Sequence, residues 1–272
     1  MSLRIQNNVE ALNAHRQLQS TSDKLSKAME RLSSGYRINR AADDAAGLAI
    51  SEKMRGQIKG LGQAQRNLQD AVSMVQTAEG TLSTVHSMLQ RVRELAVQYN
   101  NGTLSASDKA SITAEVSQLC AEISRIGSDT KFNGIAVLTG SSSITFQVGA
   151  DDGQTIAVNA VALFGSGSGF KVDSSIFNFG TTVTLASIDA AIQGVSDARS
   201  TFGSVQNRLE HTLNNLATFQ ENLTSSESRI RDVDMASEMV NFTKLQILQQ
   251  AGTSMLAQAN QAPQGVLSLL RG

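Results

Sequence analysis

The chain has 272 residues, of which 23 are basic and 24 acidic, and it contains one proline, no tryptophan and 4% aromatic residues. The opposite charges nearly cancel and are interspersed, so the composition excludes a strongly basic surface for nucleic acid or an anionic membrane. No stretch approaches the roughly 20 apolar residues of a membrane-spanning helix, and the start of the chain lacks the apolar core of a signal peptide. We therefore expect a protein that stays in the cytosol or leaves it without a cleaved signal.

The first 33 residues carry an apolar stripe with a step of seven residues, which predicts an amphipathic helix. Its members are Ala11, Leu18, Leu25 and Leu32. The sequence Ser-Ser-Gly interrupts the stripe, so we expect a linker or hinge over 33–43. Asp43 and Asp44 at the end of this linker can cap the helix that follows.

The longest feature is an apolar seam, by which we mean a row of side chains that recurs on one helical face, over 44–100. Its spacing is typical of coiled-coil packing, and at 1.5 Å per residue the helix would be about 85 Å long. A second such seam runs over 185–232, and we expect the two long helices to pack against each other. The seam residues are Leu61, Ala64, Leu68, Ala71, Val75, Ala78, Leu82, Val85, Leu89, Val92, Ala96 and Tyr99, followed by Ile188, Val195, Phe202, Leu209, Leu216, Leu223 and Ile230.

Between the two seams the sequence changes its period twice. Ser105 and Asp108 resemble a capping box that opens a helix over 106–127. Apolar and polar residues then alternate on both sides of a glycine-containing turn, which predicts a β-hairpin within the region 132–184. The alternating apolar residues are Ile144, Phe146, Val148, Ile156 and Val158. The segment 139–184 is rich in Ser, Thr and Gly, so we expect exposed loops whose hydroxyls are candidate sites for O-linked sugar.

The tail 235–272 carries one more apolar stripe and thus mirrors the amphipathic start of the chain. A helix with a narrow apolar face gains little stability alone, because most helical stability in proteins comes from packing. We therefore expect both ends to pack against other copies of the chain. The stripe contains Met235, Met239, Phe242, Leu245, Leu248, Met255, Leu256 and Ala259, and a last cluster after Pro263 contains Val266, Leu267, Leu269 and Leu270.

The sequence offers no constellation for catalysis. His15, His86 and His211 lie on three different expected helices, and no metal-binding motif, phosphate-binding loop or nucleophile motif is present. We expect no enzyme activity, no metal and no cofactor. The single Cys120 is interpreted as a small buried hydrophobic residue rather than a reactive thiol. Asn101 to Thr103 match the short N-glycosylation pattern, which also occurs by chance.

Six long segments closely resemble bacterial flagellin, and they occur in order from one end of the chain to the other. They are LRIQNNVEALNAHRQL at 3–18, LSSGYRINRAADDAAGLAISEKMRGQIKGL at 32–61, LQRVRELAVQ at 89–98, GSVQNRLEHTLNNL at 203–216, ESRIRDVDMASEMVNFTK at 227–244 and LAQANQAPQGVLSLLR at 256–271.

The resemblance implies a mainly α-helical fold, an elongated antiparallel coiled-coil bundle with a small β-hairpin region and paired N- and C-terminal helices. The terminal coiled coil would be a discontinuous inner-core domain of 1–43 and 235–272. The rod domain, 44–234, would contain the helices 44–100, 106–127 and 185–232 together with the hairpin and loop region. Few residues remain for the middle of the chain, so the resemblance implies a minimal flagellin without substantial outer domains.

The function implied by the resemblance is a structural subunit that self-assembles into the helical filament of the extracellular bacterial flagellum and serves motility. Members of this family are exported unfolded through the flagellar type III apparatus, with a chaperone on the C-terminal segment. The implied partners are other copies of the chain, that export chaperone, the export apparatus, and the filament cap and hook-associated proteins. No nucleic acid and no membrane insertion are implied. The alternative is a hook–filament junction protein, which shares the terminal helices.

Two groups of site residues follow from this resemblance. Arg91, Leu95 and Glu115 match the central positions of an epitope that a vertebrate Toll-like receptor detects in many flagellins, although subunit contacts or solvated charges beside Val92 would explain them equally. The candidates for polymerisation and chaperone binding are Leu18, Leu25, Leu32, Phe242, Leu245, Leu256, Leu267 and Leu270.

Overall fold

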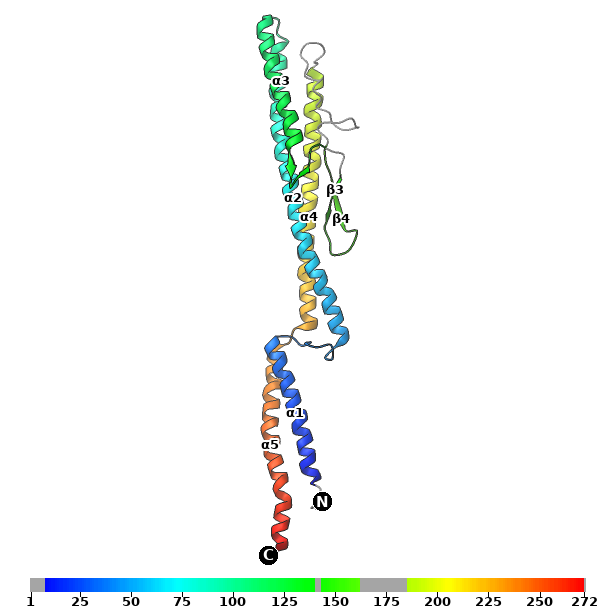
Figure 1. The fold of residues 1–272 in the computed structure, drawn as a ribbon, viewed down its shortest axis with the longest axis vertical. Helices are drawn as coiled ribbons and strands as arrows, with labels where there is room; N and C mark the ends of the chain where they lie inside the picture. Colours follow the sequence, from blue (N-terminus) through cyan, green and yellow to red (C-terminus); the bar gives the residue numbers. More distant parts are fainter. Residues whose placement is uncertain (1–7, 140–142, 162–184, 272) are drawn as a thin grey trace. The chain divides into compact units, whose positions relative to one another are not determined.

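The computed structural model describes residues 8–139, 143–161 and 185–271, and their side chains up to residue 261. Five helices and two small antiparallel hairpins make up this part of the chain, so the prediction of a mainly α-helical bundle with a hairpin region is confirmed (Figure 1). The helices are α1 (Val9–Ser34), α2 (Ala45–Tyr99), α3 (Ala106–Asp129), α4 (Leu185–Arg231) and α5 (Met235–Arg271). No helix in the described ranges is long and apolar enough to cross a membrane.

The chain forms two compact units, one of Met1–Gly56 with Asn222–Gly272 and one of Gln57–Glu221. In the unit of Gln57–Glu221, the apolar seam of α2 is the centre of the core. All its predicted members from Leu61 to Ala96 are at most 3% exposed, and Tyr99 is partly buried. Side chains of α3, α4 and both hairpins complete the same core. The seam on α2 is therefore the surface on which this unit is built.

Helix α4 runs antiparallel to α2. Arg93 contacts Asp189 near one end of the pair, and Gln65 contacts Gln220 at the other. The seam residues of α4 from Ile188 to Leu209 are at most 1% exposed. Beyond them, Leu216, Leu223 and Ile230 are only half-buried, although the repeat continues without a break. The spacing thus identifies the packing face, but not how far along the helix a partner covers it.

The capping box predicted at Ser105 and Asp108 is present at the start of α3, with each residue's side chain bonded to the other's backbone N–H. Two hairpins follow: β1 (Lys131–Phe132) pairs with β2 (Ile135–Ala136), and β3 (Ser143–Gln147) pairs with β4 (Thr155–Asn159). The second of these hairpins was predicted. The first surrounds the turn at Asn133 and Gly134, where both residues have positive φ.

In the other unit, the connector 35–44 is held by a clasp with the last residue of α4 and the residues just after it. Gly35 ends α1 in the left-handed conformation, which lets the chain turn sharply. The N–H of Arg37 then donates to the carbonyl of Arg231, and the N–H of Val233 donates to the carbonyl of Gly35. The guanidinium of Arg231 lies 4.9 Å from the ring centre of Tyr36, a cation–π contact.

Asp43 and Asp44 have different roles in this connector. Asp44 accepts a hydrogen bond from the N–H of Gly47 and caps the start of α2, as predicted. Asp43 instead accepts the N–H groups of Asn39 and Arg40 and pairs with Lys27 of α1 at 2.5 Å, with only 9% of its side chain exposed. The hydrogen bond from Lys27 and those from the backbone lower the pKa of Asp43 from 3.8 to about 2. Asp43 thus fastens the connector to α1.

We predict that replacing Phe202 by Ala lowers the free energy of unfolding by about 3–5 kcal/mol, because the ring is only 1% exposed within the core. The matched control is Phe219→Ala on the same helix, whose ring is 50% exposed and whose loss should cost less than about 1 kcal/mol. Denaturant titration followed by circular dichroism measures both. Equal costs for the two variants would contradict the assigned core.

The ion pair of Asp43 predicts a dependence of stability on pH. Because its pKa is lowered on folding, the charged carboxylate stabilises the folded state above pH 3.8, and this contribution is lost as the pH falls towards 2. Asp43→Asn should therefore be less stable than the wild type near neutral pH, and the difference should shrink as the pH falls through 2. The control is Asp23→Asn on α1, which removes the same charge from an exposed side chain. Unfolding titrations at several pH values measure the difference.

Candidate assembly surface

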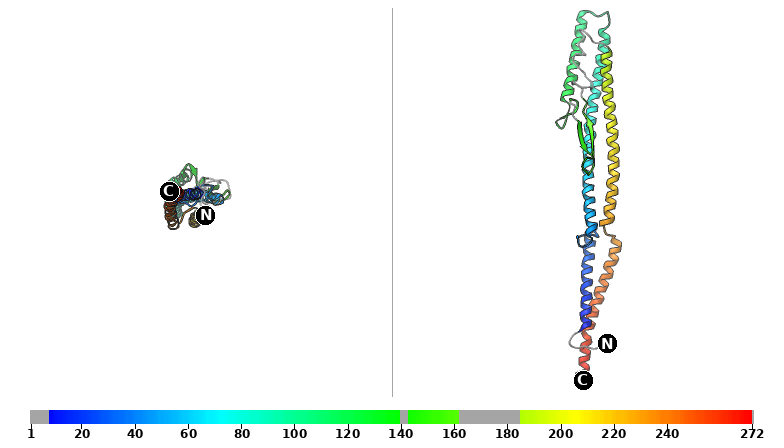
Figure 2. Two further views of the ribbon diagram at one scale, coloured as in Figure 1. Left: turned by 90° about the horizontal axis from the view of Figure 1, so that it is seen from below. Right: turned by 90° about the vertical axis from the view of Figure 1, so that its right-hand side faces the viewer.

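Helices α1 and α5 form an antiparallel pair within one compact unit (Figure 1). The side-chain amide of Asn8 donates to the carbonyl of Ala259 at one end, and Arg31 pairs with Glu238 at 3.9 Å at the other. Figure 2 shows the two helices side by side from a second direction. The pair is the candidate surface for assembly, because it holds most of the residues predicted for polymerisation.

The predicted polymerisation residues whose side chains are described lie on the inner faces of this pair. Leu245 is 7% exposed, and the others are half-buried. A Cβ atom placed on Gly252 would lie 3.1 Å from Cδ1 of Leu18, so glycine permits the close approach of the two helices at this level. The half-buried residues are Leu18, Leu25, Leu32, Phe242 and Leu256, whereas the side chains of Leu267 and Leu270 lie outside the described part.

A second group of apolar side chains on α5 is exposed to solvent. At 100° per residue, Val240 and Ile247 lie on the side of the helix away from Leu245, and Met255 lies on the flank between the two sides; the three are 64–70% exposed. Met235, Met239 and Leu248 add exposed apolar atoms at 47–48%. Sequence reasoning treated the tail as one stripe and omitted Val240 and Ile247. The signal was the seven-residue spacing of Val240 and Ile247, which places both on one side of the helix, outside the predicted stripe.

The three residues matched to the receptor epitope lie in the unit of Gln57–Glu221 and do not share one environment. Arg91 of α2 bonds Glu115 of α3 at 3.0 Å and Glu94 at 3.1 Å, and all three side chains are about half exposed or more. The carboxylate of Glu115, followed by that of Glu94, raises the pKa of the Arg91 guanidinium, which stays charged. Leu95 is 1% exposed and packs in the core. The structure therefore brings Arg91 and Glu115 together on the surface and buries Leu95 in the core.

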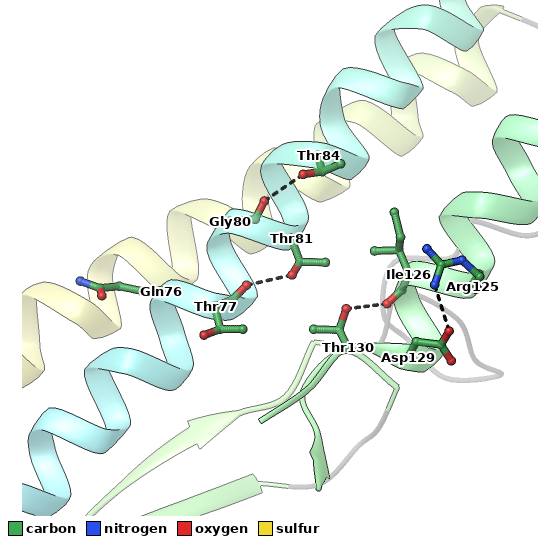
Figure 3. A pocket seen from close by; sticks show the side chains of 9 residues that line it. All are labelled: Gln76, Thr77, Gly80, Thr81, Thr84, Arg125, Ile126, Asp129 and Thr130. Atoms are coloured by element: carbon green, nitrogen blue, oxygen red, sulfur yellow. Dashed lines mark hydrogen bonds and ion pairs between the residues drawn. The ribbon is translucent and has the colours of Figure 1, made fainter. Parts of the chain in front are cut away.

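A shallow groove of about 500 Å³ lies between α2 and α3 (Figure 3). The hydroxyls of Thr81, Thr84 and Thr130 each donate to a carbonyl oxygen one turn back along the chain. The guanidinium of Arg125 donates hydrogen bonds to the carboxylates of Glu122 and Asp129. These groups satisfy each other and form no pairing of a nucleophile with a base.

The remaining reactive side chains also form no site. Burial raises the pKa of the Cys120 thiol to about 12, so the thiol stays protonated and is a weak nucleophile. His15, His86 and His211 lie on α1, α2 and α4. Among the residues that the structure describes, no cluster of His, Cys, Asp and Glu could hold a metal ion.

Comparison with known proteins gives a consistent result along the chain. The model of the bacterial flagellin N-terminal helical region matches residues 5–143, and that of the C-terminal helical region matches 185–270. A flagellin of Halalkalibacterium halodurans is 50% identical over 98% of this chain and 99% of its own. A flagellin of Bacillus subtilis is 49% identical over 99% and 100%, and the flagellar filament 33 kDa core protein of Treponema phagedenis is 47% identical over 98% and 99%.

The two family models match 5–143 and 185–270, which is well over half of the chain, and the relatives align over nearly their whole length. The chain belongs to the bacterial flagellin family.

Proposed function

We propose that this chain is a structural subunit that self-assembles into the helical filament of the bacterial flagellum, outside the cell. The observation that carries the proposal is the exposed apolar face of α5, opposite the face that packs on α1. Each large apolar side chain gains about 1.5–3 kcal/mol when it is fully buried. Val240, Ile247 and Met255 together would thus supply several kcal/mol to each contact between copies.

Membership of the flagellin family favours a second copy of the chain as the partner that covers this face of α5. The Treponema phagedenis relative is named as a flagellar filament core protein. The inner face of α5 contacts α1 of the same chain, and its outer face differs from it in sequence. Contacts between unlike surfaces that do not close into a ring generate an open helical polymer. The terminal domain of 1–43 and 235–272 would therefore be the inner core of the filament and 44–234 the rod domain around it.

The same apolar face supports the proposed export route. Apart from Ala28, Thr21 and Leu245, the described side chains of α1 and α5 are not fully buried, so the isolated pair is weakly stabilised. Such a segment can remain unfolded while the chain passes the flagellar type III apparatus. We infer that an export chaperone covers the C-terminal segment beforehand, and that the growing filament meets cap and hook-associated proteins.

We predict that Ile247→Asp abolishes filament growth while the unit of Gln57–Glu221 stays folded. The substitution places a charge on the proposed contact, and burying an unpaired charge costs several kcal/mol. The control is Gln246→Asp, which puts the same charge on an adjacent exposed polar position. Sedimentation and negative-stain electron microscopy measure assembly, and circular dichroism reports the helices.

Deletion of 236–272 provides a second variant and should leave a soluble monomer. Filaments formed by this truncation or by Ile247→Asp would contradict the proposal. The wild type also distinguishes the alternative of a hook–filament junction protein, since a filament subunit grows alone into micrometre-long filaments, whereas a junction protein forms short plugs.

A role as a ligand of a vertebrate Toll-like receptor is a second proposal, supported by the exposed pair of Arg91 and Glu115. We expect Arg91→Ala to reduce activation of receptor-bearing reporter cells by the monomer, because it removes the exposed guanidinium that a partner would contact. An exposed ion pair contributes little to stability, so the fold should persist. The control is Arg125→Ala on α3, another exposed arginine paired with carboxylates. Equal activation by wild type and Arg91→Ala would refute the epitope.

A further inference from the structure

The turn between α2 and α3 contains an asparagine followed by glycine, Asn101-Gly102, in a geometry that favours a chemical change of the side chain. Asn101, Gly102 and Thr103 are all exposed. Asn101 lies two residues after the end of α2 at Tyr99, and its N–H donates to the carbonyl of Gln98. The N–H of Thr103 donates to Oδ1 of Asn101 at 3.3 Å. No ligand or partner is needed for the reaction that this arrangement permits.

We propose that Asn101 is a site of spontaneous deamidation in the folded chain. The backbone nitrogen of Gly102 gives its proton to a solvent base and attacks Cγ of Asn101. A C–N bond forms between them, the bond from Cγ to the side-chain nitrogen breaks, and ammonia leaves after taking a proton from solvent. Water then opens the resulting succinimide ring at either carbonyl and yields aspartate or isoaspartate. One water is consumed, one ammonia is released, and nothing is oxidised or reduced.

The contact with Thr103 assists the first step. Negative charge develops on Oδ1 as the nitrogen attacks, and a backbone N–H directed at that oxygen stabilises the charge, as donors in an oxyanion hole do. Gly102 has no side chain to shield its nitrogen, and a Cβ placed on it would meet no atom within 4 Å. Solvent base and water therefore have free access to the reacting atoms.

The described part of the chain contains a second Asn-Gly pair, Asn133-Gly134, whose reactivity can be compared with that of Asn101-Gly102. There φ is +49° at Asn133 and +81° at Gly134, in a two-residue turn closed by the pairing of Phe132 with Ile135. These angles are those of a type I′ hairpin turn. Ring closure would rotate the peptide between the two residues and break the turn. Among the described residues, no hydrogen bond reaches the side-chain oxygen of Asn133. Folding should thus protect Asn133 and leave Asn101 reactive.

Deamidation would change the end of α2. A carboxylate at residue 101 lies beside the negative end of the α2 dipole, where negative charge is unfavourable. Isoaspartate would also add a methylene to the backbone just before Leu104, which packs against the core. The reaction therefore converts an exposed amide into a charged group that weakens the connection between α2 and α3.

The test is peptide mapping by mass spectrometry of the purified full chain incubated at mildly alkaline pH, with isoaspartate detected by enzymatic methylation. We expect Asn101 to lose its amide several-fold faster than Asn133 in the folded chain, and both to react at similar rates in denaturant. Gly102→Ala should slow the reaction at Asn101 several-fold without changing the fold, since its φ lies outside the left-handed region.

Three results would overturn the proposal. They are an Asn101 amide as long-lived as that of Asn133 in the folded chain, an equal rate in Gly102→Ala, and a preference for Asn101 that persists in denaturant. The last result would show that local sequence, and not the folded turn, selects the site.

Discussion

Burial of one face of α2 is the interaction on which the unit of Gln57–Glu221 depends. Leu68, Val75, Leu82 and Leu89 have no exposed surface, and side chains from α3, α4 and both hairpins reach this row from different directions. The hairpins and α3 are too small to bury their apolar residues among themselves. The side chains repeat every three to four residues, so the row stays on one face of a helix of about 80 Å, whose length follows from its 55 residues.

The α1–α5 pair also packs apolar faces against each other, but this packing buries few of its side chains fully. Its inner faces meet through leucines, and Gly252 allows close approach, yet few of its described side chains are fully buried. Stable helical domains cover each apolar face with another element. Here the outer face of α5 carries Val240, Ile247 and Met255 with no covering element in the described part of the chain. An apolar patch of this kind marks an interaction surface.

Periodicity predicted the faces of the long helices well and their neighbours poorly. The members of the α2 seam are buried as expected, but Met74 and Leu95 are buried beside it, because partners on more than one side widen the covered face. On α4 the repeat continues to Ile230, whereas full burial among the seam residues ends at Leu209. The clasp at 35–44 was inaccessible to sequence reasoning, since Gly35 and Arg37 form backbone hydrogen bonds with residues nearly 200 positions away. Asp43 and Asp44 are adjacent and chemically identical, and only their contacts in the fold separate their roles: Asp43 pairs with Lys27, whereas Asp44 accepts the N–H of Gly47.

The two apolar faces of α5 connect the physical and functional proposals. A helix that is apolar on opposite sides is stable only when both sides are covered. The chain supplies one cover, α1, and leaves the other to a partner. Before assembly an export chaperone would have to occupy that face, because large exposed apolar patches promote aggregation. After assembly a neighbouring copy would occupy it. Under the proposed function, the same side chains would make export and polymerisation mutually exclusive states of one surface, and the order of the two events would follow from which partner the surface meets first.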